Sequence, residues 1–247
     1  MCGRFAAAWE PSLIGELLHA ELAPHLPHPS WNISPQSSIA IALATAQGHT
    51  KIVSAYWSLI PTTSPTAHLA YPTFNARVES ALSKPTYAAS AERMRAIIPV
   101  SGYYEWKSGR EPYYFSLADG KPLWLAGLYS WWPERELSEE EASKRGYVYP
   151  VPGKNFSSRL SATILTQQAQ GEPAQVHSRM PVFVPDNLVP DWLNRSVPGR
   201  EIFPELQRLS TSLLPELDQH RVAPLKGDSK QLTNEWSPAQ SSLPFDE

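Results

Sequence analysis

The sequence predicts an α+β fold in which short helices flank a mostly antiparallel, partly closed sheet. Strand-like runs dominate the middle of the chain, whereas helical periodicity is confined to its margins. The 25 prolines among 247 residues are spread along the chain rather than clustered, which is typical of rigid turns and strand edges. A chain of this length with a 42% hydrophobic fraction can bury a sizeable core.

The first part of the chain is predicted to contain one helix and one pair of strands. Residues 10–22 have a proline in the first turn and apolar side chains at helical spacing, which predicts a helix. Residues 23–36 contain four prolines and are predicted as a loop. The runs 39–43 and 51–59 are strand-like, are separated by a glycine turn, and are expected to pair as a hairpin or meander. Residues 61–73 form a second loop, rich in Pro, Thr and Ser.

The middle of the chain is predicted to supply most of the sheet. Residues 84–95 are expected to be helical, with an early proline and two arginines near the end. Runs rich in aromatic and β-branched residues follow, which favours strands. These predicted strands are residues 96–100, 102–106, 113–117 and 123–131. Towards the C-terminus, strands are predicted at residues 160–165 and 182–184, and short helices at residues 186–194 and 201–209.

Two segments are expected to lie outside the packed core. Residues 133–158 carry the acidic run Glu139-Glu140-Glu141 and few apolar anchors, which predicts a solvated surface insertion. After Gly227 the chain is polar and contains proline, which predicts a loosely tied tail over residues 227–247. We therefore expect a single domain over residues 1–226.

Composition excludes several classes of protein and site. A formal net charge of −3 excludes a surface coated in positive charge, although it allows a locally basic cleft. No run has the length of a transmembrane helix, and the N-terminus lacks the apolar core of a signal peptide, so we expect a cytoplasmic protein. The seven histidines show no paired ligand spacing, and the single cysteine excludes an internal disulfide and a thiolate cluster. No phosphate loop or serine elbow occurs, and we expect neither a metal nor an organic cofactor.

Cys2, directly after Met1, is the strongest chemical feature of the sequence. Removal of Met1 leaves an α-amine and a thiol on one residue, and the amine, with an ordinary pKa of about 7.7–8.0, is partly neutral at cellular pH. Such a 1,2-aminothiol can attack an ester or amide, or can condense with an aldehyde and close a five-membered thiazolidine. Taken alone, a cysteine at position 2 is more often an incidental residue of a disordered terminus.

Other polar side chains interrupt otherwise apolar strands. Asn75 and Arg77 stand two residues apart, so they share one face if this stretch is extended. Glu105 lies in an aromatic, strand-like run where a carboxylate is unexpected, and His177 and Arg179 lie between two predicted strands. Each also has a structural explanation: a surface arginine, an edge-strand carboxylate, or a satisfied core or loop histidine.

Seven short motifs occur in a fixed order along the chain. They are Met1-Cys2-Gly3-Arg4, Trp57-Ser58-Leu59-Ile60-Pro61, Asn75-Ala76-Arg77-Val78-Glu79, Ile98-Pro99-Val100-Ser101-Gly102-Tyr103-Tyr104-Glu105-Trp106, Ala126-Gly127-Leu128-Tyr129, Thr163-Ile164-Leu165-Thr166 and His177-Ser178-Arg179-Met180-Pro181. With these motifs the chain resembles the SRAP (SOS-response-associated peptidase) family from residue 2 to about residue 225. It departs from the family pattern at Ser58, where glycine is usual, at Ala96, where cysteine is frequent, and in the insertion.

The resemblance implies an α+β pseudo-barrel that binds abasic sites in single-stranded DNA and cross-links to them through the N-terminal cysteine, without a cofactor. Matched by motif, the catalytic positions are Cys2, Asn75, Glu105 and His177. The DNA-contacting positions matched in the same way are Arg4, Arg77, Trp106 and Arg179. Trp57 is a further candidate for DNA contact, because either it or Trp106 could stack on a base beside the gap.

The residue types suit trapping of the aldehyde at C1′ of a ring-opened abasic sugar. The amine of Cys2 would form a Schiff base, and the thiolate would then close the ring. Glu105 is expected to take up the amine or thiol proton, His177 to pass a proton to the sugar oxygen, and Asn75 to hold the opened sugar. Arg77 and Arg179 suit bidentate phosphate contacts.

Two alternatives remain at this point. The first is a self-processing cysteine peptidase in which Cys2 is the nucleophile and Glu105 or His177 is the base. The second is a non-catalytic module that binds single-stranded DNA. For the leading hypothesis we expect a monomer, nucleoid-associated when bound to DNA, with possible lyase activity.

Overall fold

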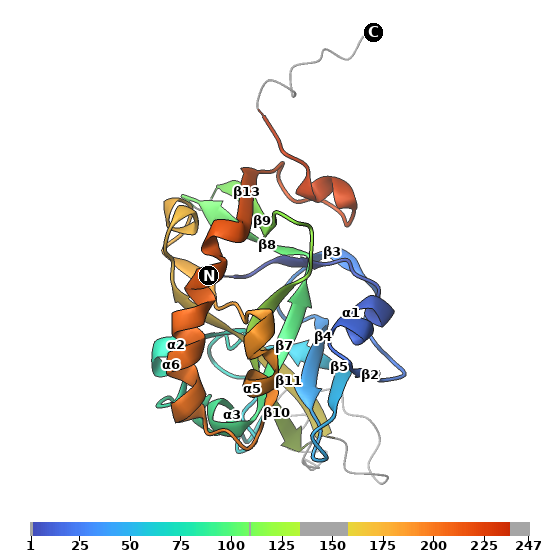
Figure 1. The fold of residues 1–247 in the computed structure, drawn as a ribbon, viewed down its shortest axis with the longest axis vertical. Coiled ribbons are helices and arrows are strands. Elements are labelled where there is room, and N and C mark those ends of the chain that lie inside the picture. Colours follow the sequence, from blue (N-terminus) through green and yellow to red (C-terminus); the bar gives the residue numbers. More distant parts are fainter. Residues whose placement is uncertain (1, 109, 134–157, 238–247) are drawn as a thin grey trace.

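The computed structural model describes residues 2–108, 110–133 and 158–237, whose strands form two sheets (Figure 1). The smaller sheet has the strand order β13-β9-β8-β1-β3. Its strands are β1 (Phe5–Ala7), β3 (Ser30–Ile33), β8 (Gly102–Lys107), β9 (Glu111–Leu117) and β13 (Leu217–Arg221). The larger sheet has the order β12-β11-β10-β7-β4-β5-β2, and β6 pairs with β11. Its strands are β2 (Glu21–Leu22), β4 (Ser38–Ala44), β5 (Thr50–Trp57), β6 (Asn75–Arg77), β7 (Arg95–Val100), β10 (Leu123–Pro133), β11 (Ser158–Gln168) and β12 (Arg179–Pro181).

The larger sheet closes on itself. Strand β11 pairs antiparallel with β10, and it also pairs parallel with β5 through Ser161 opposite Tyr56 and Ala162 opposite Trp57. Strands β11, β10, β7, β4 and β5 therefore form a ring, which is a small barrel. The predicted α+β fold with mostly antiparallel strands is confirmed, and so is the hairpin of β4 and β5.

Short helices surround this barrel, and α2, α3, α5 and α6 lie along one side of it (Figure 1). The α-helices are α1 (Pro11–Leu17), α2 (Val78–Ala81), α3 (Ala88–Arg93), α5 (Val189–Leu193) and α6 (Gly199–Ser210). The 3-10 helices are η1 (Glu172–Gln175), η2 (Asp186–Leu188), η3 (Thr211–Glu216) and η4 (Lys230–Thr233). Helix α6 buries Ile202, Phe203 and Leu206, which recur at helical spacing and pack against the barrel in one apolar cluster.

Several predicted boundaries are wrong because tertiary pairing overrides local periodicity. The predicted helix 10–22 ends at Leu17, and Glu21–Leu22 instead pair with β5 as a short strand. The predicted helix 84–95 is helical only over Ala88–Arg93, since Arg95 begins β7. The Arg95 guanidinium is buried and donates to the carbonyl oxygens of Glu92, Trp192, Asn194 and Val197, which ties this strand to α5 and the following loop.

Other boundaries differ in the same way. The predicted loop 23–36 contains β3, which pairs with β1. The predicted strand 182–184 is displaced to Arg179–Pro181, with only an isolated bridge from Phe183 to Leu125. The predicted helix 186–194 is a 3-10 turn followed by α5.

The insertion predicted over residues 133–158 falls almost wholly on residues 134–157, which lie outside the described part of the chain. Of the segment predicted as a tail, residues 227–237 are described. There the side chain of Leu232 is buried, and the Asp228 carboxylate accepts a hydrogen bond of 2.6 Å from the backbone N–H of Trp31. Within the described residues, no helix has the length and apolar character needed to cross a membrane.

Candidate active site around Cys2

Cys2 precedes β1 and is completely buried. It belongs to an apolar cluster that includes Tyr103 of the smaller sheet and Ile98 and Ile164 of the barrel, so it lies where the two sheets meet. Burial raises the pKa of the Cys2 thiol well above its usual range, and the negative charge of Glu105 raises it further. A hydrogen bond from the backbone of Arg4 acts in the opposite direction.

Glu105 supplies a buried carboxylate whose charge acts on that thiol. It lies on β8 with its side chain 4% exposed, two residues after Tyr103 and therefore on the same face of the strand. Its charge contributes to the raised pKa values of both Cys2 and Tyr103, which places the three groups in one microenvironment. A buried carboxylate in the same microenvironment as a thiol is a candidate general base for it.

Asn75 reaches the same place from the barrel. It is the first residue of β6 and lies opposite Ile164 of β11 in a parallel pairing. Its side-chain amide donates a 2.8 Å hydrogen bond to the carbonyl oxygen of Cys2. Its Oδ1 is buried and has no hydrogen-bond partner among the described residues, so an acceptor is available beside the cysteine. The expectation that Asn75 and Arg77 lie on one extended segment is confirmed.

Tyr103 is a site residue that sequence reasoning missed. Its ring stacks on Phe115 with the centroids 4.7 Å apart, and its hydroxyl is buried with no hydrogen-bond partner in the described part of the chain. Burial raises the pKa of Tyr103 well above its usual range, and Cys2 and Glu105 add to the effect. The available signal was its position two residues before Glu105 in a predicted strand.

His177 lies between η1 and β12 and is half-buried. Its Nδ1 accepts a 2.9 Å hydrogen bond from the backbone N–H of Arg179, and the carbonyl oxygen of Arg179 is 3.1 Å from the same nitrogen. Both contacts are made by the backbone of Arg179, which therefore holds the Nδ1 side of the imidazole. The neighbouring Val176 packs in the same apolar cluster as Cys2, which puts the His177 loop at the rim of that cluster.

Two arginines flank the end of β11 beside this loop. Arg77 is exposed and lies opposite Thr166. Arg179 forms an ion pair with Glu79, in which Nη1 and Nη2 donate to the two carboxylate oxygens at 2.6 and 2.9 Å. Its Nη2 also donates to the carbonyl oxygen of Thr166 at 2.6 Å. Glu79 was not among the predicted site residues, although it follows Arg77 by two positions.

Arg4 and Trp106 lie on the other face of the smaller sheet. Trp106 follows Glu105 directly, so its side chain points away from the Glu105 face, and it packs beside the cluster that contains Tyr104. Nη1 of Arg4 donates a 2.7 Å hydrogen bond to the side chain of Asn32. The structure therefore does not bring these two side chains next to the Cys2 thiol.

Trp57 does not have the predicted role. The indole is fully buried, and the centroids of its ring and the Phe5 ring are 4.8 Å apart. Its Nε1 donates a 2.9 Å hydrogen bond to the carbonyl oxygen of Phe74. No face of the ring is left for a base, so the expectation that Trp57 stacks on DNA is wrong. Its residue type is explained by core packing.

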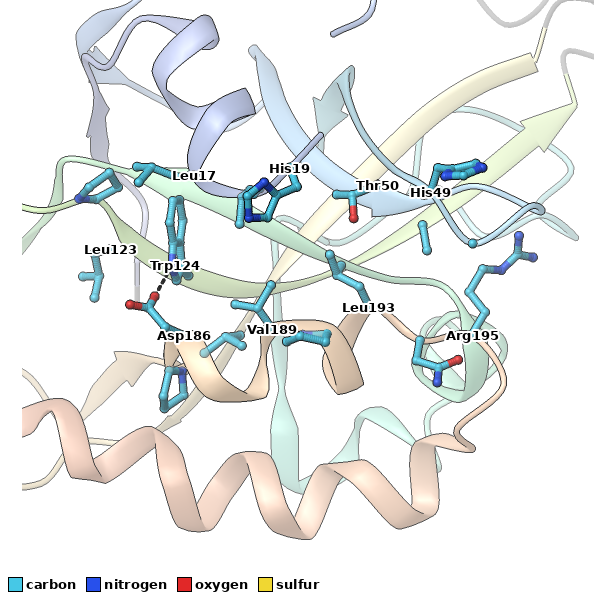
Figure 2. A pocket seen from close by; sticks show the side chains of 18 of the residues that line it. Leu17, His19, His49, Thr50, Leu123, Trp124, Asp186, Val189, Leu193 and Arg195 are labelled. Atoms are coloured by element: carbon cyan, nitrogen blue, oxygen red, sulfur yellow. Dashed lines mark hydrogen bonds between the residues drawn. The ribbon is translucent and has the colours of Figure 1, made fainter. Parts of the chain in front are cut away.

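A hollow of about 1330 Å³ lies elsewhere (Figure 2). It runs between α5 and the β4–β5 turn, and Trp124 donates to Asp186 at its wall with a hydrogen bond of 2.6 Å. None of the nine predicted site residues, all within the described ranges, lines it. Among the residues that the structure describes, no group of three or more His, Cys, Asp or Glu could hold a metal ion.

Comparison with protein families gives one match that covers nearly the whole chain. The model described as SOS response associated peptidase (SRAP) matches residues 1–225.

Three curated relatives carry the description "abasic site processing protein". YoqW of Bacillus subtilis is 28% identical over 202 residues, which cover 78% of this chain and 80% of the relative. YoaM of the same bacterium is 25% identical over 254 aligned positions, covering 98% of this chain and 100% of the relative. YedK of Escherichia coli is 25% identical over 210 residues, covering 81% and 83%.

Solved structures share the fold. A protein of Bacteroides thetaiotaomicron superimposes with a TM-score of 0.74 at 16% identity, covering 96% of this chain and 100% of the other. A protein of Bordetella bronchiseptica has a TM-score of 0.66 at 22% identity, covering 90% and 100%. At these identities the likeness establishes the fold alone.

Proposed function

This chain belongs to the SRAP family, and from that premise we propose that it processes abasic sites in DNA by forming a covalent thiazolidine through Cys2. The observation that carries the proposal is the combination of three groups: a cysteine at position 2, the buried Glu105 carboxylate whose charge acts on its thiol, and the Asn75 amide that donates to its carbonyl oxygen. The names of the relatives, which describe abasic site processing, support the substrate.

The reaction requires Met1 to be removed, so that Cys2 carries a free α-amine. The amine adds to the aldehyde carbon C1′ of the ring-opened sugar, and loss of one water molecule gives a Schiff base. The thiolate then adds to the same carbon, its electron pair forms the C–S bond, and the nitrogen takes up a proton. The sum is aminothiol plus aldehyde giving thiazolidine plus water, with no oxidant or metal consumed.

The surrounding groups divide the proton transfers. Glu105 takes a proton from the amine or the thiol, which matters because burial keeps the Cys2 thiol protonated at neutral pH. His177, whose ring is held by the backbone of Arg179, passes a proton to the ring oxygen and promotes opening of the sugar. The unpartnered Oδ1 of Asn75 accepts a hydrogen bond from a hydroxyl of the opened sugar.

DNA is held by side chains that lie around the buried site of Cys2. Arg77 is exposed at the end of β6, two residues from Asn75, and contacts a phosphate. Arg4 and Trp106, on the other face of the smaller sheet, contact DNA that continues past the site. Single-stranded DNA is the expected substrate because its unpaired backbone bends more easily than a duplex.

The test is a gel that detects a heat- and detergent-stable adduct between the processed protein and single-stranded DNA with one abasic site. Wild type is expected to give the adduct, and a protein with a tag before Cys2 is expected to bind DNA but give none. Cys2→Ala keeps the amine, so its Schiff base should appear only after reduction with borohydride. A stable unreduced adduct with Cys2→Ala would rule out the aminothiol mechanism, and no adduct with wild type would rule out the function itself.

A self-processing peptidase is the second candidate, because the same thiol and Glu105 carboxylate can act on the amide before Cys2. Translation in extracts without methionine aminopeptidase, followed by mass spectrometry, separates the two. Loss of Met1 in wild type but not in Glu105→Gln would support self-processing. A Schiff base at C1′ also permits strand cleavage by elimination, and the same gel would reveal the shorter DNA product as lyase activity.

A further inference from the structure

Two linked hydrogen bonds hold the side chain of Arg4 on the outer face of the smaller sheet. Nη1 of Arg4 donates to Oδ1 of Asn32 on β3 at 2.7 Å. Nδ2 of Asn32 donates in turn to the carbonyl oxygen of Gly227 at 2.5 Å. The opposite orientation of the amide would place its NH₂ group against the guanidinium and its oxygen against the carbonyl, so only this orientation fits. The Gly227 carbonyl therefore fixes the acceptor of Asn32 in the direction of Arg4.

The backbone of Arg4 is held separately from its side chain. Its carbonyl oxygen accepts a 2.9 Å hydrogen bond from the backbone N–H of Tyr104 on β8. The backbone of Arg4 also donates a hydrogen bond to the thiol of Cys2. Loss of the Asn32 amide would therefore release the guanidinium and leave the backbone beside the thiol in place.

The neutral amide of Asn32 orients the guanidinium of Arg4 without cancelling its charge. Arg4 forms no ion pair with a carboxylate in the part of the chain that the structure describes. Its Nε is buried, and its Nη2 donates to none of the described residues, so Nη2 is the nitrogen available to a ligand. Arg179 differs, because both of its terminal nitrogens donate to the carboxylate of Glu79. A guanidinium that is fixed in direction and keeps its charge is suited to bind a phosphate.

The segment that contains Gly227 is itself attached to the smaller sheet. It lies beyond the region that the family model matches. The carboxylate of Asp228 accepts a 2.6 Å hydrogen bond from the backbone N–H of Trp31 on β3. The backbone N–H of Trp236 donates to the carbonyl oxygen of Arg221 at 2.8 Å, and the Arg221 guanidinium lies 4.5 Å from the centroid of the Trp236 ring. Asn32 therefore donates to a carbonyl group whose position is fixed on both sides.

We propose that Asn32 is a positioning residue for DNA binding, which directs the guanidinium of Arg4 towards a phosphate of the strand that continues past the abasic site. The contact between Arg4 and DNA rests on the proposed function. The segment that begins at Gly227 supports this contact through one carbonyl oxygen. Asn32 acts on the affinity for DNA and not on the proton transfers at Cys2.

The test is a double-mutant cycle of Asn32→Ala and Arg4→Ala in the processed protein. The cycle is measured as the Kd for an unmodified single-stranded oligonucleotide at low salt. Asn194→Ala is the matched control, because Oδ1 of Asn194 also accepts one hydrogen bond, from the backbone N–H of Ser196 at 2.9 Å, in a loop that the proposal does not involve. Asn32→Asp is a second variant, since it keeps the size of the side chain and the acceptor for Arg4 but loses the donor to Gly227 and adds a negative charge.

Two further measurements separate positioning from a general loss of structure. The rate of adduct formation is followed over a range of concentrations of abasic single-stranded DNA. The heteronuclear NOE of the Arg4 Nε–H group reports the motion of the guanidinium in the absence of DNA.

Arg4→Ala should raise the Kd about tenfold or more, because it removes a charged hydrogen bond to a phosphate. Asn32→Ala should raise the Kd at least about fivefold when Arg4 is present and less than about twofold in the Arg4→Ala protein, because residues that act through one another are not additive. Its half-saturating DNA concentration should rise by a larger factor than its saturating rate of adduct formation falls. The NOE of Arg4 should decrease in Asn32→Ala.

The other two variants have separate expected results. Asn32→Asp should also weaken binding, because a carboxylate cancels the charge of Arg4. Asn194→Ala should match wild type in all three measurements.

Several results would overturn the proposal. If Asn32→Ala weakens binding equally with and without Arg4, Asn32 acts on DNA by another route. If its Kd equals that of wild type, or if the NOE of Arg4 is unchanged, the two hydrogen bonds do not position the guanidinium for DNA. Absence of binding by wild type would also overturn it. Unmodified DNA has no aldehyde to form an adduct, so the cycle decides the role of Asn32 even if the wild-type protein does not react with abasic DNA and the proposed chemistry fails.

Discussion

The substitution Glu105→Gln distinguishes two effects of the carboxylate: its electrostatic effect on the Cys2 thiol and its role as a general base. Glutamine keeps the size of a side chain that is only 4% exposed and removes the negative charge. That charge helps to raise the pKa of the Cys2 thiol, so the substitution should lower this pKa and make the thiolate easier to form. Loss of the base nevertheless slows the reaction, by about 10²–10⁴-fold near neutral pH, or about 2.7–5.5 kcal/mol of activation free energy.

The pH dependence identifies which proton Glu105 removes. With an amine pKa of about 7.8, the neutral fraction rises about sevenfold between about pH 7 and about pH 9. The thiol pKa is raised above this whole interval, so the thiolate fraction rises about 100-fold over the same two units if the thiol remains well above it in the variant. If raising the pH reduces the rate defect of Glu105→Gln by about sevenfold, the proton that Glu105 removes is that of the amine. A much greater reduction would indicate the proton of the thiol.

The measurement is adduct formation over time at both pH values, for Glu105→Gln, His177→Ala and wild type. The difference in ultraviolet absorbance between the Glu105→Gln protein and the same protein with Cys2→Ala reports the thiolate of Cys2, since the chain has one cysteine. His177→Ala should be slow at both pH values because ring opening needs an acid. A ratio of Glu105→Gln to wild-type rates that does not change with pH would refute the assignment of Glu105 as the base, and rescue of His177→Ala alone would reverse the two roles.

Three further predictions concern DNA contact and stability. Arg77→Glu should weaken binding of single-stranded DNA, and raising the salt concentration should weaken the wild type, because phosphate contacts release counterions; equal affinities at low salt would remove Arg77 from the interface. Trp57→Ala should lower the free energy of unfolding by about 3–5 kcal/mol in denaturant titrations, because the indole is fully buried, and a neutral effect would contradict its packing role. Burial raises the pKa of Tyr87 to about 12, so its contribution to stability is present below the unfolded pKa and is lost as the pH rises through the folded one. As the pH rises from about 9 to about 12, the free energy of unfolding of Tyr87→Phe should therefore fall by less than that of wild type. The difference between the two decreases, measured from unfolding curves, should be at most about 2.7 kcal/mol.

The fold class and most barrel strands were predictable because runs of apolar and β-branched residues are local signals. β4, β5, β7 and β10 lie within a few residues of their predicted positions. Short strands were not predictable. β3 lies in a proline-rich stretch and β2 at the end of helical periodicity, and each is a strand only because a partner pairs with it.

Much of the candidate site was also readable from the chain. Cys2, Asn75, Glu105 and His177 were named from their unusual positions and from motifs, and the structure places the first three in direct or electrostatic contact. Sequence reasoning could not separate Trp57 from Trp106, since both are aromatic residues in strands. Only tertiary packing shows that one is sealed in the core and the other half-exposed.

The sequence by itself determined which side chains are available for chemistry: one cysteine at position 2, one carboxylate in an aromatic strand, and arginines near both. The tertiary structure alone decided which of these charged side chains is neutralised by an ion pair and which faces solvent. Arg77 and Arg179 are equivalent as residue types, yet Arg77 faces solvent while Arg179 is neutralised by Glu79, a residue 100 positions away in the chain. The physical reason is that two charged groups pair only when they lie within a few ångströms of each other. Whether they do depends on how strand pairing brings distant chain segments together, which no local sequence pattern shows.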